Sequence, residues 1–145
     1  MLSSLPDKLV TRCQPWLGTF VEISVAEADM GAVEAAFRAI EKETLPRILV
    51  PGAVAALGGG TVMDDDSWRL VSERACTVYL DVPFEVIWER IRHLPGRPLI
   101  LNRTKAEVED LFERRRARYE QAEHRVDGTA GASQVADEVL KLWSA

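Results

Sequence analysis

Three consecutive glycines, Gly58, Gly59 and Gly60, follow the apolar residues 53–57 and precede Thr61. A buried strand that ends in residues without Cβ atoms brings bare backbone within hydrogen-bonding distance of a ligand. The same triplet also fits a tight or bulged strand exit that binds nothing. The spacing therefore predicts a binding site at this turn, with a purely structural turn as the alternative.

Basic side chains that could hold an anion gather in residues 90–125, which carry ten basic and six acidic residues. The whole chain has a formal net charge of -5 and an isoelectric point of about 5.1. Nucleic acids and anionic membranes are bound by net basic faces, so the overall charge argues against both as partners. The local excess of positive charge indicates a small anionic ligand instead.

Carboxylates and thiols give weaker signals. Asp64, Asp65 and Asp66 are adjacent, and adjacent side chains diverge, so we expect helix caps here and not a metal cluster. Cys13 and Cys76 show no CxxC spacing and no companion histidine, which favours buried free thiols.

No apolar run approaches a membrane span and no signal-type segment opens the chain, so we expect a cytoplasmic protein.

Hydrophobic periodicity supplies the elements that must position these residues. With 145 residues, 47% of them hydrophobic, the chain suits one compact domain and is too short for two. Residues 1–15 show no period and predict a loosely packed lead-in. The pattern predicts strands at 20–25, 53–57, 76–82 and 124–127, and helices at 30–49 (interrupted or restarted at Pro46), 64–74, 84–92, 104–122 and 132–143. Alternating strands and helices predict an α/β fold with three layers, a mostly parallel sheet flanked by helices.

Five motifs occur in the order and approximate spacing of shikimate kinases. They are Phe37-Arg38-Ala39-Ile40-Glu41, Ala56-Leu57-Gly58-Gly59-Gly60-Thr61-Val62, Val78-Tyr79-Leu80-Asp81-Val82-Pro83, Gly96-Arg97-Pro98-Leu99 and Arg115-Arg116-Ala117-Arg118-Tyr119. The resemblance covers residues 37–143, and several motifs in register make it specific where each alone would be weak. It implies a P-loop kinase fold of the nucleoside monophosphate kinase type, with ATP and Mg²⁺ as cofactors.

The resemblance also implies roles for single residues. Shikimate-binding positions fall on Arg38, Gly59, Gly60 and Arg115; the catalytic lid arginine falls on Arg97, and a second nucleotide-side arginine on Arg92. Guanidinium forks suit a carboxylate, and glycine amides can approach ring hydroxyls, so the residue types agree with that substrate. Arginines outside the matched positions (Arg114, Arg116, Arg118) are expected on a solvated helix face with surface ion pairs.

The front of the chain departs from that family. A shikimate kinase begins with a strand and a GxxGxGK[ST] phosphate loop, whereas the glycines upstream of the motifs are Gly18 and Gly31, and no Walker lysine is present. Residues 12–41 instead resemble the N-terminal strand and helix of FAD:protein FMN transferases, a resemblance that carries over no catalytic residue. We therefore expect one domain with a lead-in (1–15), a replaced front end (16–36) and a shikimate kinase-like body (37–145).

Two functional hypotheses follow. The first is ATP-dependent phosphorylation of the shikimate 3-hydroxyl in aromatic amino-acid biosynthesis, impaired because the phosphate loop is missing. The alternative is a non-catalytic binding or scaffold protein that retains a small-acid pocket; a flavin transferase fragment ranks third. We expect a monomer whose partner is the small molecule shikimate.

Overall fold

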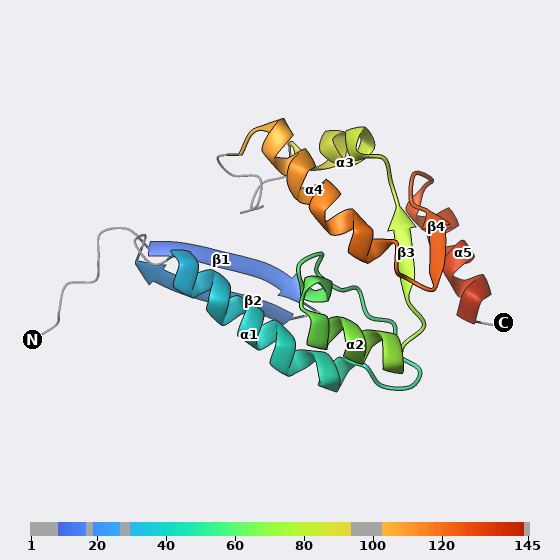
Figure 1. Ribbon diagram of the computed structural model, residues 1–145, viewed down its shortest axis with the longest axis horizontal. Helices are drawn as coiled ribbons and strands as arrows, with labels where there is room; N and C mark the ends of the chain where they lie inside the picture. The colour runs from blue at the N-terminus through green and yellow to red at the C-terminus, as the bar shows by residue number, and fades with distance from the viewer. Residues whose placement is uncertain (1–8, 17–18, 27–29, 94–102, 144–145) are drawn as a thin grey trace, which may run out of the picture. The chain divides into compact units, whose positions relative to one another are not determined.

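A computed structural model describes residues 9–16, 19–26, 30–93 and 103–143 (Figure 1). The chain divides into two compact units, Met1–Thr61 and Val62–Ala145, each of which is considered by itself. The parallel strand pair of the second unit and the helices joined to it confirm the predicted α/β class.

The first unit contains an antiparallel pair of strands. Strand β1 (Leu9–Trp16) pairs with β2 (Thr19–Ala26), with Leu9 opposite Ala26 and Trp16 opposite Thr19. Strand β2 confirms the prediction for residues 20–25. For residues 9–15 the expectation of an irregular lead-in was wrong: they belong to β1, because hydrogen bonds to the backbone of β2 hold a strand that has no hydrophobic period of its own. Residues 1–8 of the predicted lead-in lie outside the described residues.

Helix α1 (Met30–Ile48) is organised by one buried stripe. Phe37, Glu41 and Leu45 are spaced by four residues and expose only 2%, 3% and 0% of their surface. This is the i, i+4, i+8 pattern of a helix face that packs on a core. The predicted interruption at Pro46 was wrong: the helix continues to Ile48, because a proline in the last turn removes a single backbone donor near the end of the ladder.

Residues 53–57 form no strand, which corrects the prediction made from their apolar character. A strand needs a neighbouring backbone to complete its hydrogen bonds, and within the described part of the chain no strand pairs with these residues. Val54 is 70% exposed, so the segment is also not the doubly covered strand that its composition suggests.

The second unit is built around two parallel strands. Strand β3 (Val78–Asp81) pairs with β4 (His124–Asp127), with Val78 opposite His124 and Asp81 opposite Asp127. Helices α3 (Phe84–Ile91) and α4 (Lys105–Tyr119) lie between them in sequence and pack on each other, and α5 (Ala132–Trp143) packs against β4 (Figure 1). All five elements fall where the sequence pattern placed them, although α4 ends at Tyr119 and not near residue 122.

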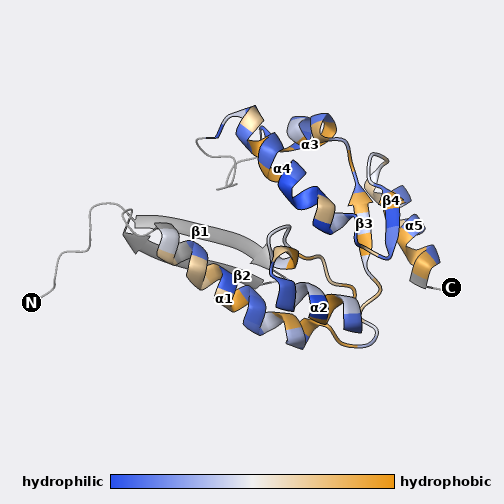
Figure 2. Ribbon diagram, viewed as in Figure 1, coloured by the Kyte–Doolittle hydropathy of each residue, from blue (hydrophilic) through white to orange (hydrophobic). Residues whose placement is uncertain are grey.

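Aromatic and branched side chains form the core of this unit. The Phe84 ring lies 5.9 Å from the Phe112 ring and 6.4 Å from the Trp88 ring, which joins α3 to α4. The buried hydrophobic residues among those described in this unit, each with no more than 9% of its surface exposed, are Val71, Val82, Phe84, Val108 and Val126. Figure 2 shows the contrast between the hydrophobic β3 and the largely hydrophilic α4, which carries Arg114, Arg115, Arg116 and Arg118.

Local capping fixes where two helices start. Asp64 accepts a hydrogen bond from the Ser67 amide at 2.8 Å and caps α2 (Asp65–Arg74), as expected for the aspartate cluster. Thr104 and Glu107 form a reciprocal capping box at the start of α4. These contacts lie within four residues of each other in sequence, which is why the sequence predicts them well.

The turn after β4 is closed by a glycine that touches β3. The Gly128 amide donates to the Asp81 carbonyl at 2.8 Å, and a Cβ on Gly128 would lie 2.5 Å from Val82 Cγ2. Arg90 of α3 donates to the carbonyls of Gly128 and Thr129 at 3.0 and 3.1 Å.

Among the described residues, no helix is both long enough and apolar enough to cross a membrane.

Candidate functional site

The first unit brings Arg38 of α1 against the glycine turn. A Cβ on Gly60 would lie 2.5 Å from Arg38 Nη2, 2.6 Å from Nη1 and 2.6 Å from Cζ. A side chain at position 60 would require the guanidinium to move, so the guanidinium occupies the space that the missing Cβ leaves. Two of the residues expected to bind substrate are therefore in direct contact.

Two carboxylates hold the Arg38 guanidinium in place. Nη1 pairs with Glu41, and Nη2 donates to Glu34 Oε1 at 2.9 Å. Glu41 belongs to the buried stripe of α1, so it gives the pair a fixed end, whereas Glu34 is half exposed. A guanidinium has five donors, and these two contacts leave others for an incoming acid.

The glycine turn also places a hydroxyl near this pair. The Thr61 amide donates to the Gly58 carbonyl at 2.9 Å, and a Cβ on Gly58 would lie 3.1 Å from Glu41 Oε1 and 3.3 Å from Thr61 Oγ1. Thr61 exposes 3% of its surface, and its Oγ1 has no hydrogen-bond partner among the described residues. The donors of Arg38 and the backbone of the glycine turn thus lie together, which suits a ligand with a carboxylate, while the Thr61 hydroxyl is buried from solvent.

Sequence reasoning did not single out Glu41 and Thr61, which complete this arrangement. Glu41 lies three residues after Arg38 in a predicted helix, a spacing at which opposite charges meet. That spacing was the available signal. The role of Thr61 depends on how the turn closes, which no local pattern in the sequence encodes.

Arg115, the other residue expected to bind substrate, lies in the second unit on α4. It is half-buried and contacts Tyr119, the next turn of its helix. Burial raises the pKa of Tyr119, and the positive charge of Arg115 and its hydrogen bond oppose that rise. Since Arg115 and Gly59 belong to different units, their joint action on one substrate stays a prediction.

The nucleotide-side residues are described only in part. Arg92 follows α3 and pairs with Glu89 at 2.9 Å, with 43% of its side chain exposed. Arg97, the expected lid residue, lies in residues 94–102, outside the described residues. The roles assigned to both arginines stay predictions.

Three further arginines of α4 differ from one another. Arg114 and Arg116 form ion pairs with carboxylates four residues away, and 66% and 42% of their side chains are exposed, as expected for a solvated face. Arg118 has only 19% of its side chain exposed, pairs with Asp65 and lies 5.8 Å from the centre of the Trp68 ring. It therefore joins α4 to α2 through tertiary contacts that a solvated helix face does not have.

The second unit also contains a hollow of about 290 Å³, lined by Tyr79, Tyr119, Glu120, Ala122, His124 and Arg125. The Tyr79 hydroxyl is buried, and burial, with smaller contributions from the negative charge of Asp81 and a hydrogen bond to it, raises the pKa of Tyr79. Arg125 pairs with Asp81, and its hydrogen bond lowers the pKa of that carboxyl.

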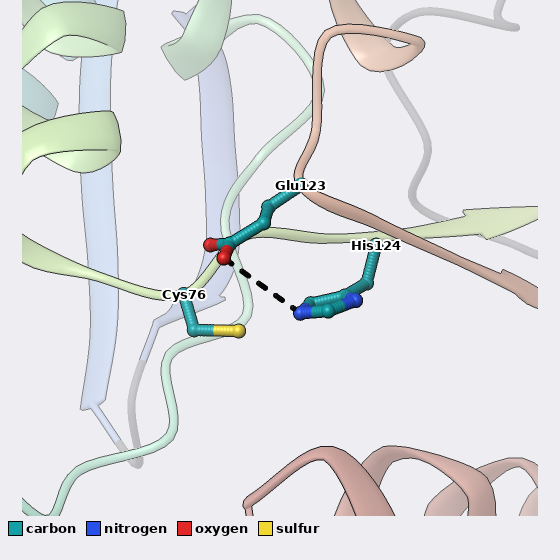
Figure 3. A group of neighbouring side chains, drawn as sticks. All are labelled: Cys76, Glu123 and His124. Carbon is teal, nitrogen blue, oxygen red and sulfur yellow. Dashed lines mark ion pairs between the residues drawn. The ribbon is translucent and has the colours of Figure 1, made fainter. Parts of the chain in front are cut away.

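Cys76 corrects a further expectation. The thiol is exposed and not buried, and His124 and Glu123 lie next to it (Figure 3). The sequence offered no companion histidine because His124 is 48 positions away and reaches Cys76 only through the pairing of β3 with β4. The side chain of Cys13 lies outside the described residues.

Comparisons with known proteins identify the relatives of this chain. A family model for shikimate kinase matches residues 17–143. Shikimate kinase from Aquifex aeolicus is 36% identical over 108 residues, which cover 74% of this chain and 64% of the relative, and Shikimate kinase 2 from Serratia proteamaculans is 32% identical over 124 residues, or 82% and 71% of the two chains.

Solved structures agree with these matches. The crystal structure of the Aquifex aeolicus shikimate kinase has a TM-score of 0.65 at 34% identity, over 77% of this chain and 66% of that one. Shikimate kinase from Bacteroides thetaiotaomicron has a TM-score of 0.63 at 25% identity, over 77% and 68% of the two chains. The match thus spans about two thirds of the length of these relatives. The matched residues and the shared P-loop kinase fold show that this chain belongs to the shikimate kinase family.

Proposed function

We propose that this chain binds shikimate through Arg38 and the glycine turn, as the acid-binding part of a shikimate kinase. The observation that carries the proposal is the contact between the Arg38 guanidinium and Gly60, with Glu34 and Glu41 holding the guanidinium in place. Preorganised donors bind more tightly because little conformational freedom is lost on binding. The carboxylate of shikimate is the partner that a planar guanidinium matches best.

Gly59 and Arg115 are the other positions that we propose for binding this substrate, as the family motifs imply. Arg115 would supply a second guanidinium to the acid end, and the family's reaction would be transfer of a phosphoryl group from ATP to the 3-hydroxyl. We also propose that the protein is cytoplasmic and monomeric, as predicted from the sequence.

The residues present do not fit ATP with Mg²⁺. Phosphoryl transfer in this fold class depends on a glycine-rich loop of amides, a lysine and a Ser/Thr that holds the magnesium ion, and the 145 residues contain no such sequence. Arg92 and Arg97 could neutralise charge on a nucleotide that is already held, but they cannot replace the loop. We therefore expect this chain to bind the acid more readily than the nucleotide.

Calorimetric titration with shikimate tests the binding proposal. Wild-type chain should bind shikimate, and Arg38→Lys should weaken binding about tenfold or more, because a lysine keeps the charge but loses the planar fork. Arg47→Ala is the matched control, since Arg47 lies on the same helix with 74% of its side chain exposed. Equal affinities of wild type and Arg38→Lys, or no binding by the wild type, would refute the proposed site.

A coupled assay for ATP-dependent shikimate phosphorylation tests the second half of the proposal. Losing one preorganised donor costs about a hundred- to thousandfold in rate, and several are absent together, so turnover by this chain should stay near background. Background turnover together with shikimate binding would support the alternative of a non-catalytic acid-binding protein. Saturable turnover that Arg97→Ala abolishes would contradict the expectation and would require a phosphate cradle elsewhere, with Gly18 and Thr19 as the first place to look.

A further inference from the structure

Three side chains with metal-binding donors converge at one place in the second unit. The ligand atoms of Cys76, Glu123 and His124 all lie within 4.8 Å of one another, and Figure 3 shows them turned toward a common space. His124 Nε2 is 3.9 Å from Glu123 Oε1. Cys76 and Glu123 are exposed and His124 is partly exposed, so an ion can reach them from solvent.

The backbone, and not chance side-chain placement, brings these residues together. Cys76 lies two positions before β3, and the next residue, Thr77, accepts two hydrogen bonds from the other segment. The His124 amide donates to the Thr77 carbonyl at 2.9 Å, and the Glu123 amide donates to Thr77 Oγ1 at 2.9 Å. The parallel register of Val78 with His124 continues this pairing. Two hydrogen bonds at one residue therefore fix the distance between the cysteine and the other two ligands.

Adjacent residues of a strand normally point to opposite faces, which would separate Glu123 from His124. Glu123, however, lies in a bend that precedes β4, so the strand alternation does not apply to it. Its side chain can turn to the same side as the imidazole. The sequence pair Glu123-His124 thus acts as two ligands on one side of the chain.

We propose that Cys76, Glu123 and His124 form a binding site for Zn²⁺, with the fourth position open to water. Thiolate, imidazole and carboxylate are the three ligand types that zinc takes from proteins. Zinc bond lengths of about 2.0 to 2.3 Å in a tetrahedron separate the ligand atoms by about 3.3 to 3.7 Å. The ligand atoms lie within 4.8 Å of one another, so they must close by up to about 1.5 Å, which these exposed or partly exposed side chains achieve by rotation about their χ angles.

The position of the site indicates what the ion does. The three ligands precede β3 and β4 or stand at the first residue of β4, so they lie at the amino ends of the two parallel strands. Asp81 and Gly128, in contrast, lie at the carboxyl ends, where α/β folds place their ligand-binding loops. The ion therefore joins the segment after α2 to the start of β4 and stabilises the strand pair without taking part in phosphoryl transfer.

The ligand types also set the preference for the ion. A thiolate is a soft ligand, and Mg²⁺ takes oxygen ligands and holds its water tightly, so magnesium should not compete at this site. This preference distinguishes the proposed site from the magnesium site that the family's reaction requires.

Titration of the full, tag-free chain with Co²⁺ tests the proposal, because a cobalt-thiolate bond has a charge-transfer absorption band and Zn²⁺ can then displace the cobalt. We expect one ion per chain, a charge-transfer band, displacement by Zn²⁺ and no displacement by Mg²⁺. Cys76→Ser should abolish the band. Cys13→Ser, the matched control at the other cysteine, should keep it.

Zinc affinity and thermal unfolding provide the second measurement. His124→Ala and Glu123→Gln should each weaken Zn²⁺ binding, the former by about a hundredfold or more, since loss of even an outer partner of a metal ligand costs 10- to 100-fold. His93→Ala, at the other histidine, should bind like the wild type. Zn²⁺ should raise the melting temperature of the wild type and not that of Cys76→Ser. A cobalt band in Cys76→Ser, its loss in Cys13→Ser, or equal zinc affinity of His124→Ala and wild type would overturn the proposal.

Discussion

Substitution of Gly60 by alanine tests the contact on which the acid-binding site depends. The added methyl group would lie 2.5 to 2.6 Å from three atoms of the Arg38 guanidinium, well inside van der Waals contact. The backbone at Gly60 does not have a positive φ, so alanine fits the local conformation and the conflict is purely with Arg38. The guanidinium must therefore move away from the turn.

The magnitude follows from what Arg38 leaves behind. Movement of the guanidinium weakens its bonds to Glu34 and Glu41, and Glu41 is 97% buried from solvent, since only 3% of its surface is exposed. A hydrogen bond between charged groups contributes about 1.5 to 3 kcal/mol. Complete loss of the partner of a buried charge costs about 3 to 5 kcal/mol, which sets the upper limit. We expect Gly60→Ala to lower the free energy of unfolding by about 1.5 to 3 kcal/mol.

Urea unfolding followed by circular dichroism measures this loss. With a slope of about 1 to 3 kcal/mol/M for a small protein, the midpoint should fall by roughly 1 M. Gly31→Ala, on the helix that carries Arg38, is the control, because a Cβ there meets nothing within 4 Å, so stability should stay the same or rise by up to about 1 kcal/mol. If Gly60→Ala behaves like Gly31→Ala, the close contact with Arg38 does not exist in solution, and the proposed acid site fails with it.

Three further predictions test single contacts. Arg115→Ala should weaken shikimate binding by about 1.5 to 3 kcal/mol by calorimetry if Arg115 forms a charge-assisted fork, and an unchanged dissociation constant would limit Arg115 to its contact with Tyr119. The hydrogen bond from Arg125 lowers the pKa of Asp81, so its contribution to stability is present above the unfolded value of about 3.9 and is lost as the pH falls through the lower folded value. Arg125→Ala should therefore differ from wild type in urea unfolding near neutral pH and converge with it at strongly acidic pH; a constant difference would contradict this cause. Thr104→Ala should lower the free energy of unfolding by about 0.5 to 2 kcal/mol through loss of the capping box, and no change in the urea midpoint would show that the box adds nothing in solution.

The helix starts at Asp64 and Thr104, which depend on neighbours in sequence, were predicted correctly, whereas the failed strand at residues 53–57 depends on a distant partner. The capping residues Asp64 and Thr104 act on amides within one turn, so their identity is enough to place the helix starts. Residues 53–57 have the composition of a buried strand, but a strand forms only if another backbone pairs with it. That partner is a property of the fold, and the local sequence does not specify it.

The same distinction holds for the candidate site. Arg38 and Gly60 were identified through family motifs, whereas their contact, and the way Glu41 holds the guanidinium, depend on how the glycine turn meets α1. The cluster at Cys76 shows the limit most clearly. Its ligands are separated by 47 and 48 positions and meet through strand register, so a search for short metal-binding spacings does not find them.

Gly128 has a consequence for genetic suppression. Its φ is not positive, in contrast to Gly52 at 80°, so what excludes a side chain at Gly128 is the Val82 methyl group 2.5 Å from its would-be Cβ. A defect caused by Gly128→Ala should therefore be repaired by a second-site change, Val82→Ala, which removes the colliding methyl and lets the new Cβ fill part of the space. A glycine required for its backbone conformation, such as Gly52, offers no such route. Selection for revertants of Gly128→Ala should thus return changes at position 82 as well as true reversion.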